Sequence, residues 1–161
     1  MPLSNRWELW HQGDRLAVMV RSPRRHTSRV ILDDGTELTL TPMGWGTVAA
    51  LEGETEWGRI VRRSWWGRRW ELVSPTFGYN LTSDPIPRRW RLRVGDHVIG
   101  HLAGGWLSYN RLAIHLDVAV PVVPLVLAWH VLARPWEAAA APTALVATAG
   151  SGATPATGLE G

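Results

Sequence analysis

The stretch that decides the fold is Val118–Ala133, VAVPVVPLVLAWHVLA, an apolar run interrupted only by two early prolines and one histidine. A helix that is apolar on every face must be buried, either in a bilayer or inside protein. Proline is tolerated at a helix start and Pro135 stops the helix, so we expect it to cover about 122–134. Such a helix spans about 20 Å, short of the roughly 30 Å hydrocarbon core of a bilayer. We therefore predict burial within protein, with a single-helix membrane anchor as the alternative.

The residues before this run alternate between apolar and polar side chains in short segments. In Arg89–Val94, RWRLRV, the alternation places three arginines on one face. Pairs such as Asp34-Gly35 and Gly95-Asp96 accept the positive φ of tight hairpin turns. Many short strands joined by such turns are typical of a sandwich or barrel. The expected strands cover about 6–12, 15–21, 28–33, 36–41, 45–51, 56–64, 69–74, 77–82, 88–94, 97–102, 105–109 and 112–119.

Strands followed by one apolar helix predict a mainly β fold. We expect a closed antiparallel β-barrel of about twelve short strands around a central hydrophobic C-terminal helix, over residues 1–136. Residues 137–161 are mostly Ala, Gly, Thr and Pro, and we expect a disordered tail. Most of the eleven tryptophans are expected in the core, filling the space between wall and helix. Trp65 and Trp66 cannot both point inward from a regular strand, so one of them should be exposed.

Positive charge is concentrated in residues 59–93. All 17 basic residues are arginines, a bias typical of GC-rich bacterial genomes. Residues 59–93 hold nine Arg and two acids (+7), whereas residues 1–58 hold six Arg and eight acids (−2) and residues 94–161 two Arg and four acids (−2). The positive segment is where an anionic partner would bind.

Arginines and tryptophans alternate in this segment, and three interpretations remain open. Arginine can bind lipid phosphates while tryptophan settles at the headgroup level. The same pair can bind nucleic acid through phosphates and base stacking. The segment can also be a solvated barrel wall whose arginines cover core tryptophans. The candidate contact residues for an anionic headgroup or phosphate are Arg62, Arg63, Trp65, Trp66, Arg68, Arg69, Arg89, Arg91 and Arg93.

Several classes of chemistry find no support in the sequence. Cysteine is absent, so neither disulfides nor thiolate zinc sites can form. The N-terminus has no apolar signal segment, and we expect a cytoplasmic protein, peripheral to the membrane if it binds lipid. No phosphate loop, dinucleotide fingerprint or nucleophile elbow occurs, so we expect no enzymatic activity, no cofactor and no metal. His130 is expected to be a hydrogen-bonded core residue.

The order of the elements also carries a resemblance to a known family. Leu112–Asp117, LAIHLD, precedes the apolar run, and Trp70 and Trp90 each stand near the start of an earlier strand. In this the chain resembles the superfamily of the Tubby C-terminal domain, the LURP-one-related proteins and the phospholipid scramblases. The resemblance implies a closed barrel around a central helix, no enzymatic site and, in some members, phosphoinositide or membrane association. The chain has no acidic cluster like a scramblase calcium loop and no pattern matching the Tubby lipid-binding residues, so no family binding residue is assigned.

Together these observations predict a non-enzymatic module that associates with anionic phospholipid headgroups through its basic segment. The alternative is a protein- or nucleic-acid-binding scaffold that uses the same face.

Overall fold

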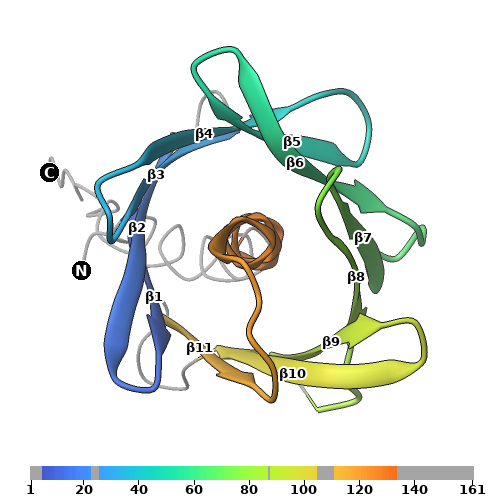
Figure 1. Ribbon diagram of the computed structural model, residues 1–161. Helices are drawn as coiled ribbons and strands as arrows, with labels where there is room; N and C mark the ends of the chain where they lie inside the picture. Colours follow the sequence, from blue (N-terminus) through green and yellow to red (C-terminus); the bar gives the residue numbers. More distant parts are fainter. Residues whose placement is uncertain (1–4, 23–25, 87, 105–110, 134–161) are drawn as a thin grey trace, which may run out of the picture.

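The computed structural model describes residues 5–22, 26–86, 88–104 and 111–133, which form a ring of strands around one helix (Figure 1). The predicted strand over 105–109 and the predicted tail over 137–161 lie outside these residues. The eleven described strands are β1 (Arg6–His11), β2 (Asp14–Ser22), β3 (Thr27–Leu32), β4 (Glu37–Pro42), β5 (Thr47–Glu52), β6 (Thr55–Arg62), β7 (Arg69–Val73), β8 (Gly78–Ser83), β9 (Arg89–Val94), β10 (His97–Gly104) and β11 (Arg111–Leu116).

The barrel is an up-and-down meander whose two ends meet. Each strand pairs antiparallel with the next along the chain, and β1 closes the ring by pairing with β11, Leu9 lying opposite Leu112. This closing pair is parallel, because ten reversals of direction leave the eleventh strand running the same way as the first. The predicted closed barrel is confirmed, with one parallel pair among antiparallel ones.

The helix occupies the barrel axis, as predicted. It covers residues 122–133, and Figure 1 places it at the centre of the ring. Every residue from Val123 to Ala133 is buried. The helical part of the apolar run therefore has a protein environment on all faces, whereas Val118, Ala119 and Pro121 before it are exposed. The hydrophobicity of the helix is explained by burial in the barrel. No helix in the described part of the chain has the length and apolar character needed to cross a membrane.

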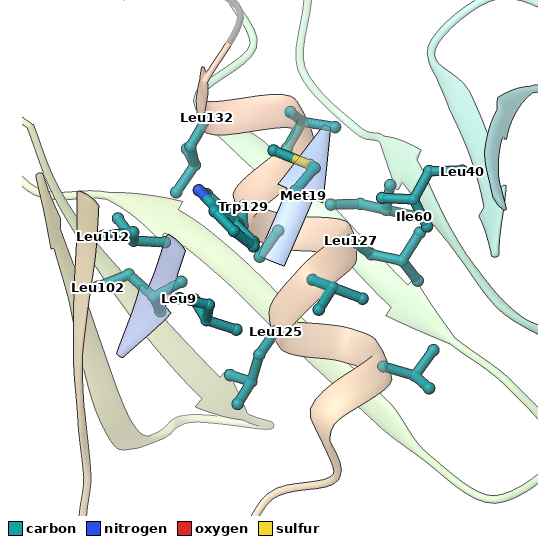
Figure 2. Packing of buried hydrophobic residues seen from close by; sticks show 14 of the residues in the cluster. Leu9, Met19, Leu40, Ile60, Leu102, Leu112, Leu125, Leu127, Trp129 and Leu132 are labelled. Atoms are coloured by element: carbon teal, nitrogen blue, oxygen red, sulfur yellow. The ribbon is translucent and has the colours of Figure 1, made fainter. Parts of the chain in front are cut away.

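Leucine dominates the inner wall that faces the helix. Figure 2 shows Leu127 pointing toward Leu40 and Ile60, and Trp129 on the opposite side of the helix. Because the helix fills the axis, the wall needs only medium-sized aliphatic side chains to close the gap. The fully buried wall residues include Leu9, Leu38, Leu40, Ile60, Leu72, Leu81, Leu92, Leu102 and Leu112.

The prediction that most tryptophans lie in the core is wrong for the described residues. Trp7 and Trp129 are buried, and Trp70 and Trp90 pack partly buried against the core. The helix and the leucine layer already occupy the interior, so little volume remains for indole rings. Trp10 and Trp57 are partly exposed, and the tryptophans that are largely exposed are Trp45, Trp65 and Trp66.

His130 is a hydrogen-bonded core residue, as predicted. Its side chain is fully buried on the helix, and its Nδ1 lies 2.7 Å from the Oγ of Ser28, which is buried on β3. The pair satisfies two polar groups that burial would otherwise penalise, and it ties the helix to the wall.

Candidate functional site

The two ends of the barrel carry opposite charge. In an up-and-down meander, alternate connections lie at opposite ends, so the turns after β1, β3, β5, β7 and β9 share one end with the segment after β11. None of these turns contains arginine, whereas acidic residues recur in them. We call this the acidic end, defined by Asp33, Asp34, Glu54, Asp96 and Asp117.

The other end gathers arginine and tryptophan. Its described connections are residue 26 between β2 and β3, residues 43–46 between β4 and β5, residues 63–68 between β6 and β7, and residues 84–86 and 88 between β8 and β9. Asp84 is the single acid in these described connections. We call this the Arg/Trp end, defined by Met43, Trp45, Arg62, Arg63, Trp65, Trp66, Arg68, Arg69, Arg88 and Arg89.

Three tryptophans at this end project into solvent. The side chains of Trp45, Trp65 and Trp66 are 71%, 75% and 82% exposed, and Met43 beside them is also exposed. The rings of Trp45 and Trp65 lie 6.1 Å apart at a tilt of 32°, although the two residues belong to different connections. Contiguous exposed apolar side chains of this size mark interaction surfaces in soluble proteins.

Arg62, at the end of β6, holds the two connections together. Its Nε donates a 2.9 Å hydrogen bond to the carbonyl of Ser64, and its Nη2 donates to the carbonyl of Trp65. Its guanidinium carbon also lies 5.4 Å from the ring centre of Trp45 and 6.0 Å from that of Trp70. A guanidinium this close to an indole face gains a cation–π interaction. Arg62 is therefore a positioning residue for the exposed tryptophans.

The β6–β7 connection is further ordered by its own side chains. The Oγ of Ser64 accepts hydrogen bonds from the backbone N–H groups of Arg68 and Arg69, at 2.8 and 3.0 Å. The Nε1 of Trp70 donates to the carbonyl of Gly67 at 2.9 Å, and Gly67 has a φ of 66° that favours glycine. The exposed indoles and guanidinium groups are thus presented by a defined loop, which lowers the entropy lost on binding.

The arginines of this end differ in how far they are already paired. Arg63 donates from Nε to Glu71 at 2.6 Å. Arg68 and Arg69 are exposed, and neither forms an ion pair with any residue that the structure describes. Their charges are available to an external anion without breaking an internal bond.

The triplet Arg89, Arg91 and Arg93 shares the outer face of β9, as predicted, because Leu92 between two of them is fully buried. The triplet nevertheless runs along the wall from one end of the barrel to the other. Arg89 lies at the Arg/Trp end, Arg91 pairs with Asp84 at 3.1 Å, and Arg93 donates from Nη2 to the carbonyl of Asp96 at the acidic end, at 2.7 Å.

The predicted contact residues therefore fall into two groups. One group surrounds the β6–β7 connection at the Arg/Trp end and consists of Arg62, Arg63, Trp65, Trp66, Arg68, Arg69 and, two strands away, Arg89. Arg91 and Arg93 lie farther along the wall. Trp65 and Trp66 are both exposed because neither belongs to a strand.

Trp45 and Met43 belong to this surface but were not among the predicted contact residues. The sequence places Trp45 at the start of an expected strand, whereas β5 begins at Thr47. The available signal is the pair Gly44 and Gly46, whose φ values of 103° and 69° make the segment a turn. The approach of Trp45 to Trp65 is a long-range contact that local patterns do not reveal.

Other candidate chemistries are weaker. Ser28 and His130 form a close serine–histidine pair, but both are buried and neither lines either of the two pockets described for this structure, so a substrate has no shown route to them. Across the described residues no group of three or more His, Asp or Glu side chains is placed to hold a metal ion.

Comparisons with known proteins identify no relative of this chain. No family model matches the chain, and neither the curated proteins nor the solved structures give a match.

Proposed function

We propose that this barrel associates end-on with anionic phospholipid headgroups through its Arg/Trp end. The observation that carries the proposal is the combination, on one ordered surface, of three solvent-exposed tryptophans with Arg68 and Arg69, which form no ion pair with any described residue. The likeness to the Tubby, LURP-one-related and scramblase superfamily, in which some members associate with membranes, is part of the same proposal.

The tryptophans supply the apolar part of the contact. Indole rings favour the interfacial zone of a bilayer, where the ring is partly desolvated and its N–H still finds polar partners. Trp65 and Trp66 project from the same short connection, and Trp45 extends the surface across to the next one. Three indoles on one rigid surface contribute more binding free energy than a single indole, because the protein loses its rotational freedom only once when all three enter the membrane interface.

The arginines supply the charged part. Each basic residue near an anionic membrane surface contributes about 1 kcal/mol, and guanidinium groups bind phosphate oxygens in two-pronged fashion. Arg68 and Arg69 are exposed beside the tryptophans, with Arg63 and Arg89 at the same end. The acidic end points away from the membrane in this orientation, which lowers the repulsion between Asp33, Asp34 and the lipid charge.

The test is co-sedimentation with vesicles of phosphatidylcholine containing phosphatidylserine. We expect wild-type protein to bind these vesicles and to bind pure phosphatidylcholine vesicles much more weakly. The double variant Arg68→Glu with Arg69→Glu should lower the affinity about 30-fold or more, from two lost contributions of about 1 kcal/mol each. The double variant Trp65→Ala with Trp66→Ala should also lower it.

Matched controls come from the other end of the barrel. Arg15→Glu with Arg93→Glu makes the same change in net charge at the acidic end, and Trp57→Ala removes an exposed tryptophan outside the Arg/Trp end. Both should retain vesicle binding. The proposal fails if vesicles do not bind, or if the control variants lose binding as strongly as the Arg/Trp variants. Binding to a labelled oligonucleotide but not to vesicles would favour the nucleic-acid alternative instead.

A further inference from the structure

A pocket opens at the acidic end, where the chain leaves the wall and enters the barrel axis. Its volume is about 380 Å³, within the range of sites that hold a small molecule or a large side chain. It lies between the turn after β1 and the segment that leads from β11 to the helix. The apolar lining comes from Leu16, Leu116, Val118, Ala119, Val120, Val122 and Leu125.

The polar groups of this pocket favour a hydrogen-bond donor or a cation. The Nδ1 of His11 lies 3.1 Å from the carbonyl oxygen of Ile114, and since a carbonyl only accepts, the ring proton is on Nδ1 and the Nε2 of the neutral ring is an acceptor. Asp117 adds a carboxylate whose Oδ1 lies 3.6 Å from the Nε2 of His115, and Gln12 adds a side-chain amide that can both donate and accept. The helix start contributes an opposing positive charge of about half a unit, and Arg15 and Arg93 also lie at this end, but the five acidic residues outweigh these positive charges.

The opposite end of the same molecule carries a side chain whose chemistry suits this pocket. Trp66 is the most exposed tryptophan in the described residues, and among them it makes no ring contact with another aromatic side chain. An indole is an apolar body with a single N–H donor, which suits apolar walls beside a histidine acceptor and a carboxylate. Arg63, Arg68 and Arg69 flank it and carry the charge opposite to that of the acidic end.

We propose that copies of this chain associate head to tail, with Trp66 of one copy in the acidic-end pocket of the next. The projecting side chain and the pocket lie at opposite ends of one barrel, so the contact uses two different surfaces and can repeat along the barrel axis. The flanking arginines face the acidic turns, and this charge complementarity speeds association and makes it sensitive to salt.

A consequence links this contact to lipid binding, and it rests on the proposed function. A copy whose Arg/Trp end is held by a neighbour cannot present that end to a membrane. Self-association therefore occludes the lipid-binding surface of every copy except the one at the end of a chain.

Sedimentation velocity without lipid tests the proposal. The wild-type chain should show a sedimentation coefficient that rises with protein concentration at low salt and rises less at 0.5 M NaCl. Trp66→Ala removes the inserted side chain, and Leu16→Trp fills the pocket. Each variant alone should remain monomeric, whereas Trp57→Ala should associate like the wild type.

Mixing the two variants gives the sharpest result. The Leu16→Trp chain keeps its Trp66 and the Trp66→Ala chain keeps its pocket, so an equimolar mixture should form dimers and nothing larger. If Leu16→Trp does not fold by circular dichroism, the exposed Asp117→Arg replaces it with the same expectation. Wild-type protein that stays monomeric up to millimolar concentration, or Trp66→Ala that associates like the wild type, would overturn the proposal. Vesicle binding that survives such an outcome leaves the proposed function intact.

Discussion

The Arg/Trp end and the acidic end are built on the same strands and the same helix, yet they differ in what they expose. The acidic end has short turns with polar and acidic side chains, and the pocket lined by His11, Leu16 and Asp117 opens there. The Arg/Trp end has longer described connections that project indoles and guanidinium groups from an ordered loop. Since the core is common to both, the difference lies in the connections, where function is usually placed on a rigid scaffold.

The largest effect should come from the core that both ends share. Leu127→Ala removes a fully buried side chain on the helix, opposite Leu40 and Ile60 (Figure 2). We expect the free energy of unfolding to fall by about 2–5 kcal/mol, because the site cannot collapse around the missing atoms. Urea denaturation, followed separately with a probe at each end, should give one common midpoint. Separate midpoints at the two ends would contradict the view that a single hydrophobic core stabilises both ends and makes them unfold together.

A second prediction compares one glycine at each end. Gly46 at the Arg/Trp end and Gly53 at the acidic end both have positive φ, 69° and 59°. A Cβ on Gly46 would lie 2.9 Å from the Cβ of Arg62, whereas a Cβ on Gly53 meets no atom within 4 Å. We expect Gly53→Ala to cost about 1–2 kcal/mol of stability and Gly46→Ala about 2–4 kcal/mol, since it adds a steric clash to the backbone strain.

The same pair of glycine variants separates stability from binding. Gly46→Ala should also weaken vesicle binding, because it displaces the residue that positions Trp45 and Trp65. Gly53→Ala should leave vesicle binding unchanged. Equal losses of stability in both variants, measured by thermal unfolding, would show that the close approach of the new Cβ to Arg62 adds no destabilisation.

The smallest expected effect is on the pKa of one carboxylate at each end of the barrel. The hydrogen bond from Arg91, with a weaker one from the backbone N–H of Ile86, holds the pKa of Asp84 below its usual value of 3.8. The backbone N–H of Thr36 holds the pKa of Asp34 below 3.8 at the acidic end. For both groups the stabilisation is present above the unfolded-state pKa and is lost as pH falls through the lower folded value.

Arg91→Gln distinguishes the two carboxylates. We expect the pKa of Asp84 to rise toward 3.8 while that of Asp34 stays low, as read from side-chain carbonyl shifts in an NMR titration. An unchanged pKa for Asp84, or a parallel rise at Asp34, would mean that the ion pair with Arg91 is not the main cause.

Much of the fold could be predicted from local patterns. Turns at Gly35 and Gly95 were recognisable because both glycines adopt the positive φ that tight hairpins require. The apolar run identified the helix, and its length and early prolines favoured burial over a membrane span. The location of the tryptophans was not predictable in the same way. Whether an indole lies inside or outside the barrel depends on how much interior volume the helix and the leucines leave free, which local patterns do not reveal.

The candidate site was predicted in part. The β6–β7 connection was recognisable as a local concentration of arginine and tryptophan. The contribution of Trp45 was not recognisable, since the β5–β6 hairpin separates Trp45 from Trp65 in the sequence and brings them together only in the folded barrel. The opposite charges of the two ends follow from alternate connections sharing an end, a pattern that appears only once the strand order is known.

The most direct measurement of the central claim uses the absence of cysteine from the chain. A single cysteine can be introduced as Ile86→Cys, an exposed position of the β8–β9 connection at the Arg/Trp end that leaves the binding arginines and tryptophans in place, or as Glu54→Cys at the acidic end. Each is labelled with an environment-sensitive NBD dye. On adding phosphatidylserine-containing vesicles, we predict a blue shift and increased emission for the label at position 86 and no change for the label at position 54. Equal responses at both positions, or a response only at position 54, would contradict end-on docking through the Arg/Trp end.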